Sequence, residues 1–332
     1  MNLKVIYRKN IKHNIEYFAS FGKKLTIMVK AEAYGHGLVN LAKILKEYDV
    51  KLGVANLDEA KRLRNVWKKE ILIVEPVKKV QELKKYGFEF VIETLDVLKE
   101  AKEIGLLGKC YIKINSGMNR FGVKYDDFKT IKKMAKIVRN TDFKGLLTHF
   151  SYLENSEISL LQAKRFAKAR SYFSPNISVS MGGSSIVKTD FVCNEYRLGI
   201  GFYGYDNENV MPIMTIKSQV LKKNFLSPGE ELGYSSGYVA PSKKEIAVIG
   251  VGYGDGIRRD LKGYHVKING KKCEIVGNIC MDCMFADVTN AMCQEGDEVA
   301  FEDAEDMAKY LKTSPYEVLT SLSNFRGEQV LY

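Results

Sequence analysis

The sequence predicts an α/β protein, a (β/α)8 TIM-type barrel followed by a β-rich C-terminal domain. Up to Tyr205, short apolar runs alternate with amphipathic segments, and eight such runs suit the eight strands of a barrel. Beyond Tyr205 the pattern changes to strands separated by glycines. A length of 332 residues accommodates a barrel and a second unit. We expect the barrel over residues 9–205 and the β-rich domain over 206–332, with an opening strand in residues 1–8 that joins the second domain.

The elements of the barrel follow from hydrophobic periodicity. Leu3, Val5 and Tyr7 alternate with polar residues and predict a short strand, and a helix is expected over Ile11–Phe21. The eight barrel strands are predicted at Leu25–Val29, Lys51–Ala55, Ile71–Val74, Phe88–Ile92, Cys110–Ile114, Gly145–Phe150, Ile177–Met181 and Arg197–Phe202. Helices are predicted between them at Leu57–Trp67, Val77–Tyr86, Leu95–Ile104, Asp126–Arg139 and Ile158–Tyr172, with a shorter one after Gly183.

The second domain is predicted from a different sequence pattern, in which strands are separated by glycines. Asn269-Gly270 is a hairpin signal, because both residues tolerate the positive φ of a tight turn. Two helices, at Met307–Leu311 and Tyr316–Leu322, are expected to close the domain. Its strands are predicted at Pro212–Leu226, Ile246–Val251, Tyr264–Ile268, Lys272–Val276 and Phe285–Val288.

Composition narrows the class of protein. The formal net charge is +11, but the lysines lie in short scattered runs, which favours a solvated helical exterior over a nucleic-acid surface. Such a surface also attracts an acidic substrate or a cofactor phosphate. There is no apolar stretch of 18 residues and no signal-peptide core, so we expect a soluble, cytoplasmic protein without a membrane partner. Cys280 and Cys283 form a single CxxC without a second ligand pair, so no metal site is expected.

The carboxyl ends of barrel strands are where chemistry is expected. The first strand delivers Lys30, and a buried strand-end lysine is costly unless it is neutralised, paired or used. One use is an imine with the aldehyde of a cofactor, for which burial helpfully lowers the amine pKa. Other strand ends carry further polar groups: Lys113, Arg120, His149, Ser184 and Arg197.

Several of these segments resemble one family. Val29–Gly37 (VKAEAYGHG) resembles the cofactor-lysine motif of the alanine racemases, and Lys113–Arg120 resembles its K-V-D-T-G-M-x-R. In the second domain, Glu231–Tyr238 looks like the segment that holds a catalytic tyrosine, Val251–Gly256 resembles the G-Y-x-D-G turn, and Val276–Asp282 resembles V-G-x-x-x-M-D. The resemblance runs from Lys30 to Ser323 in the family's order. The chain is therefore identified as a member of the alanine racemase family.

This resemblance implies pyridoxal 5'-phosphate (PLP) as cofactor, attached to Lys30. Gly-rich backbone suits its phosphate dianion, and the resemblance assigns Tyr34, Ser184, Gly199 and Ile200 to that end. Arg197 corresponds to the partner of the ring nitrogen, which a donor-only arginine keeps unprotonated. The resemblance places His149 beside the ring, and it implies the substrate-binding residues Arg120, Tyr253, Met281, Asp282 and Asn324.

A racemase needs two bases on opposite faces of a planar carbanion, and the family assigns them to Lys30 and Tyr234. In the family the tyrosine comes from the partner subunit, which implies a homodimer with two composite sites. Lys113 corresponds to a lysine that is often carbamylated and then orients Arg120. L- and D-alanine are the expected small-molecule substrates, a role compatible with supplying D-alanine for cell-wall synthesis. Asn324 stands where a tyrosine commonly narrows the pocket, so extra activity on serine is expected.

Some residues depart from the family pattern. Asn115-Ser116 replaces the usual Asp-Thr, and Ser180 stands where the family usually has a histidine. Ser180–Ser184 looks like the phosphate loop of single-domain PLP-homeostasis proteins, which leaves a non-catalytic PLP carrier as an alternative. A serine or broad-specificity racemase, a PLP decarboxylase of the same barrel type and a phosphate-binding barrel enzyme without PLP are further alternatives. Arg197 argues against the decarboxylase, and a barrel-only carrier would lack Tyr234, Met281 and Asp282.

Overall fold

Eight parallel strands close into a barrel in the computed structural model, which describes residues 1–153 and 156–332. Neighbouring strands pair in chain order, and the last pairs in parallel with the first, so the barrel has no open edge. The predicted fold class is confirmed. The barrel strands are β2 (Lys24–Met28), β3 (Lys51–Val54), β4 (Ile71–Pro76), β5 (Glu89–Ile92), β6 (Cys110–Asn115), β8 (Gly145–His149), β9 (Ser178–Gly182) and β10 (Glu195–Leu198), with the short β7 (Val123–Lys124) beside β6.

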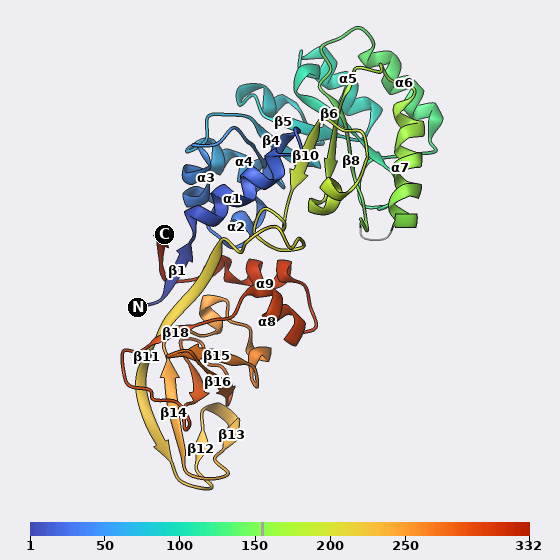
Figure 1. Cartoon of the computed structure of the whole chain (residues 1–332). Helices are drawn as coiled ribbons and strands as arrows, with labels where there is room; N and C mark the ends of the chain where they lie inside the picture. Colours follow the sequence, from blue (N-terminus) through green and yellow to red (C-terminus); the bar gives the residue numbers. More distant parts are fainter. Residues whose placement is uncertain (154–155) are drawn as a thin grey trace.

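Helices surround this barrel in the upper lobe of Figure 1. They are α1 (Arg8–Ala19), α3 (Leu38–Leu45), α4 (Leu57–Arg64), α5 (Leu95–Glu103), α6 (Phe128–Val138) and α7 (Ser156–Arg170), with 3-10 turns η1 (Gln81–Lys85), η2 (Leu107–Lys109) and η3 (Ser184–Lys188). The helix predicted over Val77–Tyr86 is wrong, because only the turn η1 forms there. Val80 and Leu83 are the buried apolar residues of that stretch, too few to stabilise a longer helix against its nucleation cost.

The second domain is built on an eight-stranded sheet that curls so that β11 and β14 also pair. Asn269 and Gly270 have φ values of 48° and 77° and connect β15 to β16, as the hairpin signal predicted. The short strands β18 and β19 were not predicted. The elements are β11 (Met214–Leu226), β12 (Glu231–Leu232), β13 (Tyr238–Val239), β14 (Lys244–Ile249), β15 (His265–Ile268), β16 (Lys271–Val276), β17 (Met284–Asp287), β18 (Glu298–Ala300), β19 (Glu328–Leu331), α8 (Ala304–Tyr310), α9 (Pro315–Ser321), and the 3-10 turns η4 (Tyr234–Ser236), η5 (Tyr253–Asp255), η6 (Arg259–Leu261) and η7 (Leu322–Asn324).

The two lobes meet where the chain begins and ends. The strand β1 (Leu3–Ile6) lies between β11 and β19 in the sheet of the second domain. Figure 1 shows both termini at this junction, with α8 and α9 facing the barrel. The contact is close, because a Cβ on Gly35 would lie 1.9 Å from the carbonyl oxygen of Leu319 in α9. The second domain therefore braces the segment that follows β2.

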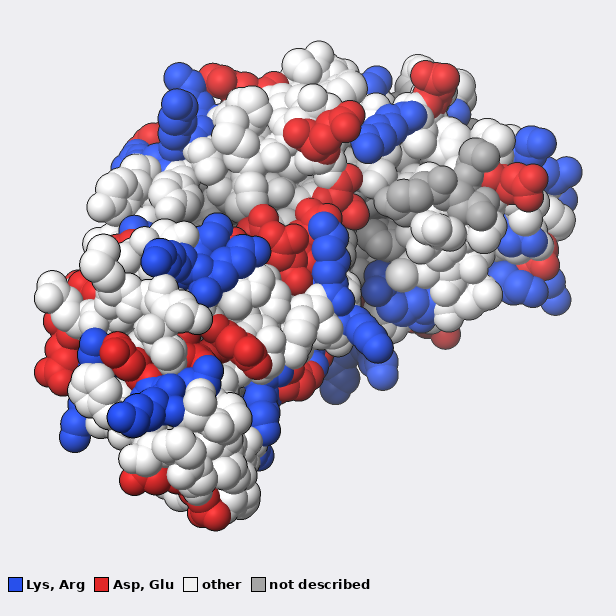
Figure 2. Space-filling view, turned by 60° about the horizontal axis from the view of Figure 1, so that its bottom comes forward, with Lys and Arg blue, Asp and Glu red and all other residues white. Residues whose placement is uncertain are grey.

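The surface carries both signs of charge. On the face shown in Figure 2, lysine and arginine side chains are interspersed with aspartate and glutamate, as expected for a lysine-rich solvated exterior. Among the described residues, no helix is both long enough and apolar enough to cross a bilayer.

Candidate active site

The carboxyl ends of the barrel strands surround a cavity of about 520 Å³. Its walls come from different strands and from the loops that follow them, the usual place for catalysis in a barrel. The structure thus brings together residues that the sequence placed on separate strand ends. Eight of the predicted site residues line it: Lys30, Tyr34, Lys113, Arg120, His149, Ser184, Arg197 and Gly199.

Lys30 opens an unusual turn, α2 (Lys30–Tyr34), directly after β2. Ala31, Glu32, Ala33 and Tyr34 have φ values of 50° to 53°, the left-handed region that costs L-residues roughly 1–2 kcal/mol each. The backbone N–H of Ala31 donates to the Glu59 carboxylate at 2.8 Å, and a second oxygen of this carboxylate accepts from the N–H of Ala55. A strained turn that its surroundings hold in place is typical of functional sites.

Electrostatics in the cavity favour neutral amines. Burial, followed by the charge of Arg120, lowers the pKa of Lys30. Burial with Arg197 and Arg120 lowers the pKa of Lys113 to about 8. Burial and the same cations lower the pKa of His149 to about 3, so its imidazole is neutral at physiological pH. The cavity is therefore electropositive and suits an anionic ligand.

Arg197 lies on the floor of the cavity and is almost fully buried. Its Nη1 donates to Ser180 Oγ at 2.8 Å, and its Nη2 donates to the carbonyl oxygen of Thr148. A Cβ on Gly182 would lie 2.5 Å from Arg197 Nη2 and 2.3 Å from His149 Nδ1, so glycine is required between them. The guanidinium is held in one place and presents only donors to a ligand.

Small residues and hydroxyls line another side of the cavity. The Ser184 hydroxyl accepts from the N–H of Gly201 at 2.8 Å, which orients this loop. A Cβ on Gly199 would lie 3.0 Å from the Tyr34 hydroxyl. Burial raises the pKa of Tyr34, so it remains a neutral phenol. Glycine backbone, a serine and a phenol form a cradle of donors that fits a phosphate, and the donor-only Arg197 fits an unprotonated ring nitrogen. The residues present therefore fit PLP.

Other predicted residues do not line the cavity of their own chain. Ile200 is buried beside Gly199. Tyr234 is 74% exposed at η4, and Tyr253 and Met281 are 42% and 53% exposed on the same domain. Asp282, also exposed, pairs with Arg326 at 2.8 Å, and Asn324 lies exposed at the end of η7.

Sequence reasoning missed Tyr316. This residue of α9 lines the cavity, with its ring 5.8 Å from that of Tyr34. It comes from the second domain of the same chain, so the pattern of barrel strand ends could not reveal it. Asp206, Glu75 and Ser185 also line the cavity without having been predicted.

Comparisons with known proteins agree with this geometry. The family model described as "Alanine racemase, N-terminal domain" matches residues 6–207, and "Alanine racemase, C-terminal domain" matches 213–330. The chain belongs to the alanine racemase family. An alanine racemase of Thermodesulfovibrio yellowstonii is 33% identical over 90% of this chain and 87% of its own.

Solved racemase structures have the same fold over the whole chain. The alanine racemase of Acinetobacter baumannii is 28% identical, with a TM-score of 0.88 over 100% of this chain and 99% of that one. The racemase of Bartonella henselae, solved with covalently bound pyridoxal phosphate, is 25% identical with a TM-score of 0.88 over the same shares. The family recognised from sequence motifs is confirmed, and so is an enzyme of the racemase class. The matched C-terminal domain distinguishes the chain from a barrel-only PLP carrier.

Proposed function

We propose that this racemase interconverts L- and D-alanine with Lys30 and Tyr234 as its two bases. Alanine as substrate and PLP as cofactor follow from family membership. When bound, PLP draws electrons from the α-carbon of the substrate and so makes its proton removable. The observation that carries the proposal is the cavity at the strand ends, where the partial burial of Lys30 and the charge of Arg120 favour its neutral form.

Lys30 is the base that the barrel supplies. Its lowered pKa increases the fraction of Lys30 that carries a free electron pair at Nζ, and in that form the amine can take a proton and later return it. The left-handed turn after Lys30, which Glu59 holds by accepting from the N–H of Ala31, keeps this amine at the carboxyl end of β2. Arg120, which lines the same cavity, provides a cation for the substrate carboxylate.

The second base is proposed to come from another copy of the chain. Tyr234 lies on an exposed surface of the second domain, which we call the η4 surface: Tyr234, Tyr253, Met281 and Asp282. Its loops are tied together, since Asn278 Nδ2 donates to the carbonyl oxygen of Tyr234 at 2.9 Å and the N–H of Tyr253 donates to that of Cys280. Exposed aromatic and methionine side chains suit an interface. In a homodimer, this surface would complete the cavity of the partner.

The remaining residues are proposed to hold the cofactor and the substrate. Arg197 would donate to the ring nitrogen, with His149 beside the ring. Tyr34, Ser184 and the backbone of Gly199 and Ile200 would hold the phosphate, for which the electropositive cavity is suited. Tyr316, near the ring of Tyr34, would narrow the phosphate end of the cavity.

A purified sample tests the cofactor assignment. We expect the protein to be yellow and its visible absorption band to disappear on borohydride treatment, because Lys30 Nζ is the attachment point. Lys30→Ala should lack the band. Lys24→Ala removes an exposed lysine from β2, the strand that precedes Lys30, and this lysine does not line the cavity; the variant should keep the band and so controls for nonspecific attachment. A folded wild type that takes up no PLP would refute the assignment.

Lys113 is proposed to be carbamylated. Only a neutral amine reacts with carbon dioxide, and the pKa of about 8 leaves an appreciable neutral fraction near neutral pH. The carbamate would replace a cation by an anion among Arg120, Arg197 and Lys30, and would orient Arg120.

The carbamate has a defined pH dependence. Because deprotonation of Lys113 must come first, its occupancy at a fixed concentration of dissolved carbon dioxide should rise as the pH is raised from 7 to 9 through the pKa of about 8. Carbon-13 NMR of protein supplied with labelled bicarbonate should show a carbamate signal that Lys113→Ala lacks. An unchanged signal in that variant would assign the modification elsewhere.

A further inference from the structure

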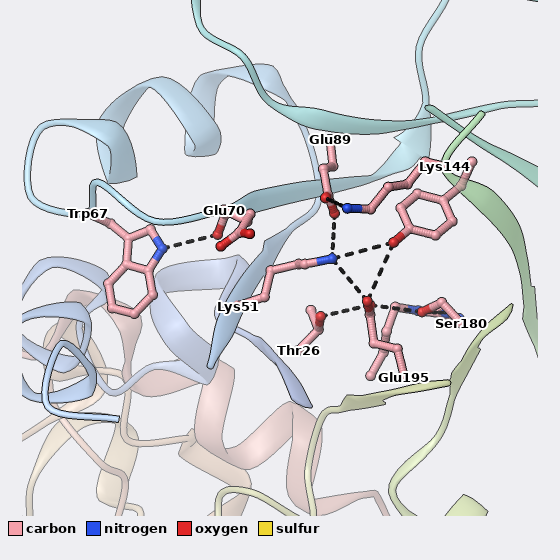
Figure 3. A network of polar contacts seen from close by, with 10 residues as sticks. Thr26, Lys51, Trp67, Glu70, Glu89, Lys144, Ser180 and Glu195 are labelled. Atoms are coloured by element: carbon pink, nitrogen blue, oxygen red, sulfur yellow. Dashed lines mark hydrogen bonds and ion pairs between the residues drawn. The ribbon is translucent and has the colours of Figure 1, made fainter. Parts of the chain in front are cut away.

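A network of polar side chains, nearly all of them buried, lies among the strands of the barrel (Figure 3). We call it the barrel network: Thr26, Lys51, Glu89, Tyr111, Ser180 and Glu195. Glu195 is its centre. One carboxylate oxygen accepts from Thr26 at 2.8 Å and from Ser180 at 3.0 Å, and the other accepts from Lys51 at 2.9 Å. Charges inside a barrel are costly unless they are paired and hydrogen-bonded, as these are.

The network reaches the cavity through Ser180. Its hydroxyl lies 2.8 Å from Arg197 Nη1 and 3.0 Å from Glu195 Oε1. A guanidinium has no acceptor, so Ser180 must accept from Arg197, and its single proton must then point to Glu195. The direction of the chain of hydrogen bonds is thereby determined.

Glu195 and Arg197 stand two residues apart on β10. Side chains at i and i+2 of a strand share a face, which explains why both point into the barrel. Burial opposes ionisation of Glu195, but the charge and hydrogen bond of Lys51, the hydrogen bond from Thr26 and the charge of Arg197 together outweigh it and lower the pKa of the carboxyl group. Burial lowers the pKa of Arg197 to about 10, and Glu195 acts against this shift. Glu195 is thus the ionised counter-charge of Arg197.

Lys51 and Glu89 continue the chain of paired charges beyond Glu195. Lys51 Nζ also donates to Glu89 at 2.5 Å, and Lys144 pairs with the other oxygen of Glu89 at 2.6 Å. Positive and negative groups therefore alternate from Arg197 to the end of the barrel near Lys144. Because each charge has a partner, Glu195 can remain ionised beside Arg197.

We propose that Glu195, acting through Ser180, positions Arg197 for the ring nitrogen of the bound cofactor. This inference rests on the proposed role of Arg197. The position of Ser180 usually holds a histidine in the family. The inference gives a physical reason for the serine found here. The serine gives the guanidinium a second acceptor beside the Thr148 carbonyl oxygen, and the Glu195 carboxylate on β10 orients this serine by accepting its proton. Ser180 and Glu195 are positioning residues, and they do not touch the substrate.

Ser180→Ala and Thr26→Val form a matched pair for testing this role. Both side chains are fully buried and both donate to the same oxygen of Glu195, but only Ser180 contacts Arg197. Titration of the PLP-stripped proteins with PLP should show an affinity weakened about 10-fold or more in Ser180→Ala. A loss of this size corresponds to the loss of one hydrogen bond to a charged group. Its visible absorption maximum should shift as well. Thr26→Val should lower the melting temperature yet keep the wild-type affinity and spectrum.

Glu195→Gln is the second variant, since it keeps an oxygen for Ser180 while removing the charge. It should change the spectrum in the same direction as Ser180→Ala. If either variant folds, melts like Thr26→Val and keeps the PLP affinity and spectrum of the wild type, the network is a structural core only and the inference is overturned. These readouts need PLP binding and no turnover. A protein that binds PLP but does not racemise alanine would therefore refute the proposed function and leave this inference measurable.

Discussion

Tyr234→Phe should lose alanine racemisation by about 1,000-fold or more while it binds PLP as the wild type does. A positioned general base contributes roughly 10²–10⁴-fold, and phenylalanine keeps the ring but has no ionisable hydroxyl. Tyr234 is 74% exposed and lies outside the cavity of its own chain, so the substitution should not disturb folding or cofactor binding. Racemisation of L-alanine and PLP content measured on the same samples test this expectation.

Isotope exchange identifies which base serves which enantiomer. In deuterated water, Tyr234→Phe should still exchange the α-proton of the enantiomer that Lys30 serves, which the family resemblance assigns as D-alanine. Tyr238→Phe is the matched control: it makes the same chemical change in the neighbouring strand β13 and should leave both exchange rates near wild type. Equal loss of exchange for both enantiomers in Tyr234→Phe, at normal PLP content, would contradict the two-base assignment.

The barrel half of the cavity could be predicted because its residues follow strands in the chain. Lys30, His149 and Arg197 each occupy or follow a short apolar run, and parallel strands in a closed barrel bring their carboxyl ends together. The hydrophobic periodicity and the spacing of the apolar runs were sufficient to place these residues at one end of the barrel. The resemblance to family motifs then indicated their chemical roles. The hairpin at Asn269-Gly270 was predictable for a similar reason, since the turn needs residues that accept positive φ.

Other parts of the site depend on contacts between distant segments. Tyr316 reaches the cavity because α9 packs against the turn after Lys30, a contact between segments near opposite ends of the chain that no local pattern encodes. The left-handed turn is stabilised by Glu59 from α4, so its strain could not be inferred from the turn itself.

The barrel network was missed for a different reason. Lys51 and Glu195 begin their strands, where a charged residue usually marks solvent. Only the closed barrel shows that both side chains point inward and pair at 2.9 Å. A charged residue at the start of a strand is thus ambiguous until its facing partner is known.

Mixing two inactive variants should restore activity if the site is composite. We expect Lys30→Ala and Tyr234→Phe chains, exchanged at equal amounts, to recover about a quarter of wild-type activity, since half of random dimers are mixed and each has one intact site of two. The intact site combines Lys30 of one chain with the η4 surface of the other. This surface is exposed and apart from its own cavity, as a donated surface must be.

A chain that carries both substitutions provides the opposite test. Mixed with wild-type chains, it should inhibit them, because each site of a mixed dimer lacks either the lysine or the tyrosine hydroxyl. Wild-type chains should therefore lose about half of their activity when the two chains are exchanged at equal amounts. If Lys30 and Tyr234 instead acted within one chain, the two single variants would stay inactive after mixing and the double variant would leave wild-type activity unchanged.

Subunit exchange, followed by native mass spectrometry of chains of different mass, must accompany both measurements. Activity recovers in one mixture and falls in the other, and both changes follow from a single arrangement in which Lys30 and Tyr234 of different chains meet. Loss of protein or partial unfolding could lower activity in the second mixture but could not raise it in the first. The pair of results therefore distinguishes a composite site from a damaged one.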